Sequence, residues 1–359
     1  MTPPTGTAAI TGREFGRMPD GRPVQEYTLD NGAGMTLSAI NFGGIVTSIR
    51  VPDRQRRTGN VVLGFATLAE YLAHNPNCGT IVGRYANRIG GGQLVLDDQV
   101  YQLDLNDGPN CLHGGMQGFG KRWWSITPQP PGADGSVALQ LDYCSAHGEG
   151  GFPGRLEASV RYTLTPGAQW RVDYRATTDR PTVVNLSHHD YFNLAGGGSA
   201  LAHRLTLAAS RYTPVDRHLI PTGVAAVTGT PFDFREARTI EERIRDSDPQ
   251  LALACGYDHN WLLDRPDDSA LAFAARLEDP ASGRVLEIET TEPAMQFYSG
   301  NFLDGRLLGA GGQLYRQGDG LCLEPQHSPD SPNQPGFAST VLQPGGVFTS
   351  STVYRFGVS

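Results

Sequence analysis

The sequence predicts an all-β protein, a large antiparallel β-sandwich in which residues 1–359 form a single domain. Three observations predict this fold class. Apolar residues mostly alternate with polar ones, neighbouring segments can be paired into hairpins, and helical patterns are few. Glycine occurs 45 times and proline 25 times, which supplies the turns that many short strands need. No linker rich in glycine, serine or proline divides the sequence.

The N-terminal third contains a few local signals. Its first roughly 15 residues are expected to be flexible. TLAEYLAHN (67–75) predicts two turns of helix. QLVLDDQVYQL predicts a hairpin that turns at Asp97-Asp98. The basic run RQRR (54–57) follows the turn residues Pro52 and Asp53, so it is interpreted as a solvated loop.

The rest of the chain is predicted to be mainly strands. Alternation in VALQLDY, SVRYTL and WRVDY predicts three strands between residues 137 and 174. EARTIEERIRD (236–246) predicts a second short helix. Residues 271–290 predict a hairpin that turns through the Pro280 to Gly283 cluster.

Composition limits the function classes. Apolar residues make up 39% of the chain and charged residues 18%, enough for a sizeable core. The net charge of -8 argues against a nucleic-acid partner, since no cluster of basic residues offsets it. No segment approaches the roughly 18 apolar residues of a membrane span. We therefore expect a small-molecule partner, no nucleic acid and no membrane, in a monomer or homodimer.

The cysteines favour a reducing compartment. There are five, an odd number, widely spaced and without a CxxC pair: Cys78, Cys111, Cys144, Cys255 and Cys322. A disulfide framework or a zinc cage is therefore not expected, and reduced core thiols are. The N-terminus lacks the basic and apolar regions of a signal peptide, so a cytoplasmic location is predicted.

One segment departs from the strand pattern. NLSHHDYFNL (185–194) is flanked by apolar residues like a buried strand, yet it contains His188, His189 and Asp190. Alternation places Ser187, His189 and Tyr191 on one face, and His188 and Asp190 on the other. Only one of the two histidines can therefore face a given cleft.

Four other segments place polar residues where a plain strand has none. They are GRYANRIGGG (83–92), NCLHGG (110–115), GYDHNW (256–261) and LCLEPQHSPDSPNQP (321–335). In the last one, alternation directs Leu323 to the core and Glu324 away from it. Each segment alone has an ordinary explanation as a turn, a cap or an edge charge.

Together the segments resemble one family, the aldose 1-epimerases (galactose mutarotases). The resemblance runs from about residue 20 to the C-terminus. Its motifs are ANRI, LHGG, HDYFNL, YDHN, QFYSGNFLDG and LEPQxxPDxPN. It implies a β-sandwich of the galactose mutarotase-like type that interconverts the α and β anomers of aldohexoses such as glucose and galactose. It also implies a sugar cleft across an open sheet face, with no metal and no organic cofactor.

The resemblance implies roles for individual residues. Glu324 matches the general base, His189 the general acid, and His113 a second histidine near the sugar ring oxygen. The residues that match groups holding the sugar hydroxyls are Asn87, Arg88, Asp258 and Gln296. Arg84 falls outside the match and is expected to be structural.

The chain departs from the family pattern twice. His188 stands where Asn is frequent, and Pro325 where Thr is common. The chemistry needs a base on the C1 hydroxyl and an acid on the ring oxygen. We therefore expect Glu324 to be ionised and His189 to be largely protonated near neutrality.

Other interpretations stay open at this point. Glu324 and Asp258 could serve as the two carboxylates of a glycoside hydrolase. The protein could bind a sugar without catalysis, with aromatic residues as a platform: Trp123, Trp124, Phe297 and Tyr298. A metal site could use His113, His189, Asp258 and Glu324. An epimerase of hexose 6-phosphates would need basic residues at the cleft, for which Arg84 and Arg122 are the candidates.

Overall fold

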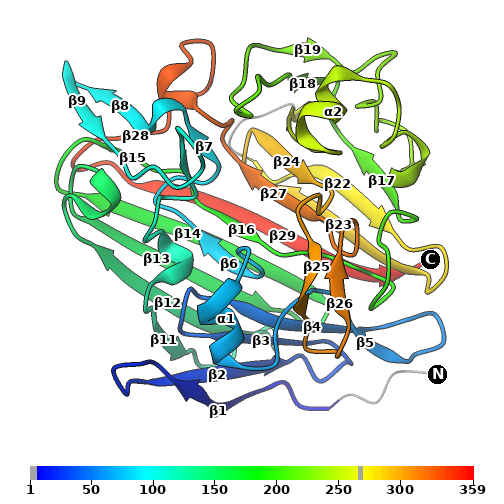
Figure 1. The fold of residues 1–359 in the computed structure, drawn as a ribbon. Coiled ribbons are helices and arrows are strands. Elements are labelled where there is room, and N and C mark those ends of the chain that lie inside the picture. Colours follow the sequence, from blue (N-terminus) through cyan, green and yellow to red (C-terminus); the bar gives the residue numbers. More distant parts are fainter. Residues whose placement is uncertain (1–5, 266–269) are drawn as a thin grey trace.

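A sheet of nine antiparallel strands forms the centre of the computed structural model, which describes residues 6–265 and 270–359 (Figure 1). From edge to edge the strands are β11 (Ser125–Pro128), β12 (Val137–Ser145), β13 (Leu156–Leu164), β14 (Gln169–Thr178), β29 (Phe348–Val358), β23 (Arg284–Thr290), β22 (Ala272–Glu278), β17 (Arg204–Leu207) and β20 (Arg238–Thr239). In β13 every second residue is buried, as the alternation predicts. The predicted strands between residues 137 and 174 are confirmed.

Two five-stranded sheets accompany this large sheet. The first contains β1 (Ala9–Arg17), β2 (Pro23–Asp30), β3 (Thr36–Ile40), β4 (Val46–Pro52) and β5 (Thr58–Asn60). The second has the order β19 (Ala225–Ala226), β18 (Arg211–Thr213), β21 (Asp258–Leu262), β24 (Ala294–Tyr298) and β27 (Cys322–Gln326). One hydrophobic core contains residues of all three sheets, among them Leu37, Trp170 and Trp261. The predicted β-sandwich is confirmed.

Five strand pairs complete the sheets. They are β6 (Thr80–Val82) with β16 (Ser187–His189), β7 (Arg88–Ile89) with β10 (Cys111–Leu112), β8 (Gln93–Leu96) with β9 (Gln99–Gln102), β15 (Thr182–Val183) with β28 (Val341–Leu342), and β25 (Asp304–Leu308) with β26 (Leu314–Arg316). Both predicted hairpins form. Asp97 and Asp98 have positive φ angles of 49° and 60°, the backbone that a two-residue turn needs.

The N-terminal segment that is predicted to be flexible includes residues 9–15. They belong to β1, which pairs with β2 from Ala9 to Arg17 with a register shift between Glu14 and Gly16. Residues 1–5 lie outside the described residues. The five cysteines are free, as expected, but only three are buried, and Cys144 and Cys255 are exposed.

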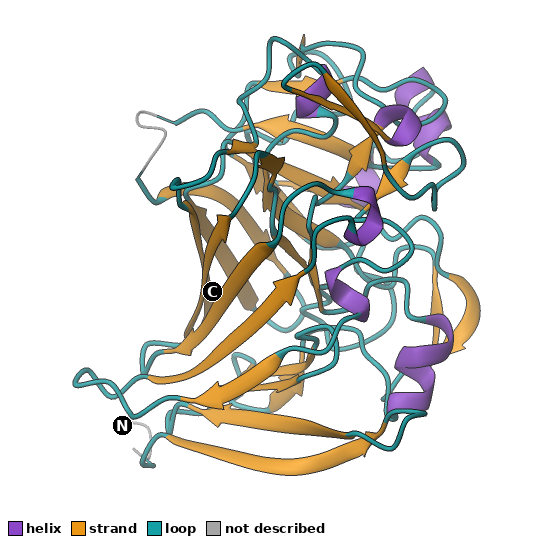
Figure 2. Ribbon diagram, turned by 90° about the vertical axis from the view of Figure 1, so that its left-hand side faces the viewer, coloured by secondary structure: helices purple, strands orange, loops and turns teal. Residues whose placement is uncertain are grey.

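Helices are short, and Figure 2 shows them toward one side of the molecule. The helix α1 (Leu68–His74) confirms the first helix prediction, with Thr67 and Glu70 capping each other. The helix α2 (Pro249–Ala254) was not predicted, although Asp248 caps it and proline opens it. The described residues contain five 3₁₀ turns: Gly90–Gly92, Phe119–Lys121, Glu149–Gly151, Ile240–Glu242 and Ser331–Asn333. No helix among the described residues is long and apolar enough to cross a membrane.

The predicted helix over residues 236–246 is wrong. The segment forms β20 and one 3₁₀ turn. The amides of Ile240 and Glu241 donate to the carbonyls of His203 and Leu201, which lie in a distant part of the chain. Tertiary hydrogen bonds thus replace the local ones that a helix would need.

Candidate active site

Three neighbouring strands place polar side chains on one sheet face. Across β21, β24 and β27, Asn260 lies opposite Gln296, and Gln296 lies opposite Glu324. Side chains alternate along a strand, so the next residues point the other way, and Phe297 and Leu323 lie in the core. The predicted orientation of Glu324 is therefore confirmed.

The histidines of β16 face opposite ways. His188 is 1% exposed, with Nδ1 2.7 Å from Asp190 Oδ2 and Nε2 2.8 Å from the Tyr162 hydroxyl. The Nε2 atom of His189 lies 3.8 Å from Glu324 Oε1. Ser187 lies on the same face as His189, and its hydroxyl donates to the carbonyl of Pro325 at 2.7 Å. Alternation has therefore turned His189 and Glu324 toward each other, and a hydrogen bond ties their two strands.

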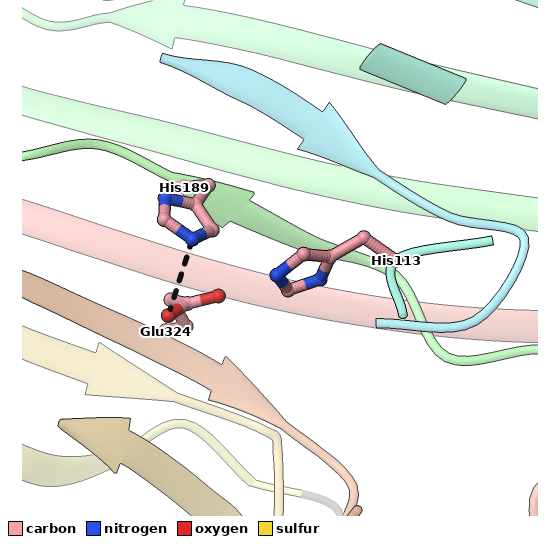
Figure 3. Close-up of side chains that lie close together, drawn as sticks. All are labelled: His113, His189 and Glu324. Carbon is pink, nitrogen blue, oxygen red and sulfur yellow. Dashed lines mark ion pairs between the residues drawn. The ribbon is translucent and has the colours of Figure 1, made fainter. Parts of the chain in front are cut away.

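His113 is the third member of this cluster, and Figure 3 shows its ring near the ring of His189 and the carboxylate of Glu324. The two imidazole rings meet edge to face with centroids 5.1 Å apart. The His113 loop lies very close to another backbone segment. A Cβ on Gly114 would be 2.0 Å from the carbonyl oxygen of Gly83, and Gly114 has a φ of 85°. Glycine at this position therefore allows the loop to bring His113 beside His189.

A polar chain continues from the cluster. The backbone amide of Asn87 donates to His113 Nδ1 at 3.1 Å. The next residue, Arg88, donates to Asp107 Oδ2 at 2.7 Å and lies 3.8 Å from Asp258 Oδ2. Gln296 donates to the other oxygen of Asp258 at 2.7 Å. The predicted site residues thus form a ring of contacts, which the cross-strand pairing of Gln296 with Glu324 completes: Glu324, His189, His113, Asn87, Arg88, Asp258 and Gln296.

Burial controls the charge of the central pair. Glu324 is 2% exposed, and burial, with the nearby Asp258 carboxylate, raises the pKa of Glu324 well above its usual value. Burial lowers the pKa of His189 to about 4. Burial thus favours a proton on Glu324 over a proton on His189. Both shifts run opposite to the expected ionised Glu324 and largely protonated His189.

The sheet face that carries Glu324 has acceptor oxygens that receive no hydrogen bond from the described residues. The oxygens Glu324 Oε2, Gln296 Oε1 and Asn260 Oδ1 are buried and have no hydrogen-bond partner among the described residues. Each unpaired buried polar atom costs about 1–3 kcal/mol. A ligand rich in hydroxyl groups would supply the missing donors.

The same cluster could hold a metal ion. His113, His189 and Glu324 each offer one ligand atom, and these atoms lie within 4.8 Å of one another. Two imidazoles and a carboxylate form a ligand set that zinc accepts. The geometry alone therefore permits both acid–base and metal chemistry, and a chelation experiment must separate them.

Comparison with known proteins separates the broader interpretations. A model of the family "Aldose 1-epimerase" matches residues 25–355. The chain belongs to the aldose 1-epimerase family. It is 42% identical over 354 residues to the galactose mutarotase of Rattus norvegicus, covering 98% of this chain and 99% of the rat protein. It is 39% identical over 342 residues to the aldose 1-epimerase of Escherichia coli K12, covering 94% and 96%.

Solved structures of the aldose 1-epimerase family share the fold. Galactose 1-epimerase from Lactobacillus acidophilus NCFM superposes with a TM-score of 0.86 at 27% identity, covering 98% of this chain and 99% of that chain. The GalM/aldose epimerase homologue from C. elegans gives 0.83 at 29% identity, covering 90% and 96%. The fold predicted from the resemblance is therefore correct in type.

Sequence reasoning about this epimerase missed three residues of the site. Asp107 binds Arg88, Asn260 contributes an acceptor to the cleft face, and Cys322 Sγ lies 3.5 Å from His189 Nδ1. Asn260 belongs to the quoted YDHN motif, so alternation from Asp258 could have found it. The other two contacts join distant segments, and no local pattern indicates them.

The structure gives the partners or the burial of four of the alternative basic and aromatic candidates. Arg84 is 2% exposed and donates to the carbonyls of Pro153 and Gly154, so its structural role is confirmed. Arg122 pairs with Glu149 at 3.3 Å. Both guanidinium groups thus have partners within the protein. Of the four aromatic candidates, Trp124 and Phe297 are 0% exposed and cannot form a platform for a sugar.

The His188→Asn substitution should affect stability more than turnover. It would remove one partner of the buried Asp190 carboxylate and of the Tyr162 hydroxyl. Breaking a buried pair of this kind costs roughly 3 kcal/mol, which urea unfolding would measure. Turnover should change by no more than a few-fold, since His188 faces away from Glu324. A loss of turnover as large as that of a His189 variant would contradict this orientation.

Proposed function

We propose that this chain interconverts the α and β anomers of aldohexoses such as glucose and galactose, with Glu324 as base and His189 as acid. One observation carries the assignment of roles. In a chain of the aldose 1-epimerase family, the carboxylate and the imidazole lie 3.8 Å apart on facing strands. The other Glu–His ion pair among the described residues joins Glu292 to His327, and neither of these belongs to the cluster with His113.

The proposed reaction opens and recloses the sugar ring. Glu324 removes the proton of the C1 hydroxyl while His189 protonates the ring oxygen. The bond between C1 and the ring oxygen breaks, and the open-chain aldehyde forms. Rotation about the C1–C2 bond exposes the other carbonyl face, and the two proton transfers reverse as the ring closes. Each well-placed acid or base contributes roughly 10²–10⁴-fold.

The active arrangement carries one proton on the pair, on His189 and not on Glu324. Burial favours the opposite arrangement, which is the one left after ring opening. Sugar hydroxyls that donate to Glu324 would stabilise its carboxylate and shift the proton toward His189. We propose that Arg88, Asp258, Gln296 and Asn87 hold the hydroxyl groups, and that His113 lies near the ring oxygen.

The pH profile of turnover should be bell-shaped, with limbs assigned to the pair. Near the His189 pKa of about 4, the imidazole takes up a proton while Glu324 is also protonated. The pair then has no base, and turnover falls. At high pH, Glu324 loses the last proton at a pKa above the usual carboxyl range, and turnover falls again. Temperature separates the limbs, because imidazole ionisation has a large enthalpy and carboxyl ionisation a small one. The acid limb should move with temperature and the alkaline limb should not; the reverse would contradict this assignment.

Several broader features accompany the proposal. The partner is a small sugar molecule, and the net charge of -8 favours neither nucleic acid nor another polyanion. The five free thiols favour a reducing compartment, so we propose a cytoplasmic location. The proton transfers need no metal and no organic cofactor.

Polarimetry tests the proposed function. Freshly dissolved α-D-glucose and α-D-galactose should reach their equilibrium rotation faster with the protein than without it. Prolonged EDTA treatment should leave the rate unchanged, and a loss that zinc restores would identify a metal enzyme. Nitrophenyl glycosides serve as the control substrates. Their cleavage without faster mutarotation would replace the proposal with a glycoside hydrolase.

A further inference from the structure

Two adjacent histidines in β16 have different partners at the same ring atom. Nδ1 of His188 lies 2.7 Å from the Asp190 carboxylate. Nδ1 of His189 lies 3.5 Å from the thiol sulfur of Cys322. The histidine that faces away from the cleft thus has a carboxylate partner, and the histidine that faces Glu324 has a thiol partner.

Cys322 is held firmly where it meets His189. It is 0% exposed and lies opposite Tyr298 in the pairing of β24 with β27. It lies two residues before Glu324, so the two side chains share one face of the strand. A single strand therefore presents Glu324 to one nitrogen of His189 and Cys322 to the other.

The partner atom decides how strongly an imidazole keeps its proton. A carboxylate next to Nδ1 stabilises the charged ring and makes it a weaker acid. A thiol sulfur is a weak acceptor of the Nδ1 hydrogen, and burial raises the pKa of the Cys322 thiol well above its usual value, so the thiol is neutral. The sulfur can therefore orient the ring of His189 without stabilising its protonated form as a carboxylate would.

We propose that Cys322 is a positioning residue for His189, whose sulfur accepts the Nδ1 hydrogen and holds the ring with Nε2 toward Glu324 and the sugar. In the acid form both nitrogens are protonated, with Nδ1–H directed to sulfur and Nε2–H into the cleft. After the transfer the ring is neutral, still protonated at Nδ1, with a free lone pair at Nε2 for the return step. This assignment rests on the proposed function for its kinetic consequence, but not for the tautomer.

Two substitutions separate the hydrogen bond from packing. Cys322→Ala and Cys322→Ser both remove sulfur and leave a similar cavity, but only serine keeps an acceptor. Loss of the orienting contact should lower kcat of the alanine variant roughly tenfold with KM nearly unchanged. The serine variant should stay within about threefold of the parent kcat. The midpoints of thermal unfolding of the two variants should be similar.

Nitrogen NMR of the sugar-free protein gives a readout that does not depend on activity. With ¹⁵N-labelled histidine, and with His189→Asn to assign its signals, neutral His189 should be the Nδ1–H tautomer in the parent and in Cys322→Ser. In Cys322→Ala it should be a mixture of both tautomers. An unchanged tautomer in the alanine variant would overturn the proposal, as would equal losses of kcat in both variants. Failure of the polarimetric test with an intact tautomer effect would instead overturn the proposed function alone.

Discussion

The His189→Asn variant is expected to turn over aldohexoses roughly 10²–10⁴-fold more slowly than the parent, the scale of a lost general acid. Asparagine is of similar size and can donate a hydrogen bond, but its amide cannot transfer a proton to the ring oxygen at neutral pH. KM should change little, because the ring of contacts through Arg88, Asp258 and Gln296 remains. Stopped-flow polarimetry, corrected for the spontaneous reaction, measures the effect.

The adjacent histidine provides the matched control. His188→Asn makes the same chemical change one residue earlier, on the opposite face of β16. The structure predicts that His189→Asn lowers turnover with little effect on stability, and that His188→Asn lowers stability with little effect on turnover. If His189→Asn kept more than about a tenth of the parent turnover, His113 would be the next acid to test.

Side-chain direction was the part of this site that could be predicted from the sequence. Alternation depends only on the local backbone. It predicted that His189 and His188 point to opposite faces, and that Glu324 and Leu323 do so as well. The same property explains the success in β12 to β14. Such predictions hold even where β16 is only three residues long, because pairing with β6 fixes the strand geometry.

Contacts between distant segments explain why other predictions from the sequence differ from the structure. The segment 236–246 has a helical composition, but the carbonyls of Leu201 and His203 capture its amides. The prediction of an ionised Glu324 did not include the burial that raises its pKa, since the side chains that exclude water from it come from other strands. Neither the burial of Glu324 nor the contact between Cys322 and His189 leaves a trace in the local pattern. Proton placement therefore required the three-dimensional arrangement.

The Glu324→Gln variant is expected to lose several orders of magnitude in turnover, and more than any other single variant considered. Glutamine keeps the shape of the side chain and its hydrogen-bonding capacity, but it cannot accept the C1 hydroxyl proton. It also removes the carboxyl group that lies 3.8 Å from His189 Nε2. Sugar affinity should change by less than about tenfold, the pattern of a lost transition-state interaction.

A second buried glutamate controls for the loss of a carboxylate as such. Glu292 is 3% exposed and pairs with His327 at 2.7 Å, outside the ring of site residues. Glu292→Gln should therefore lower the unfolding free energy while leaving turnover near the parent value. If Glu324→Gln instead retained more than about a tenth of the parent turnover, the base would have to be another carboxylate. Asp258 would then be the group to replace, because burial also raises its pKa and it lies on the same sheet face.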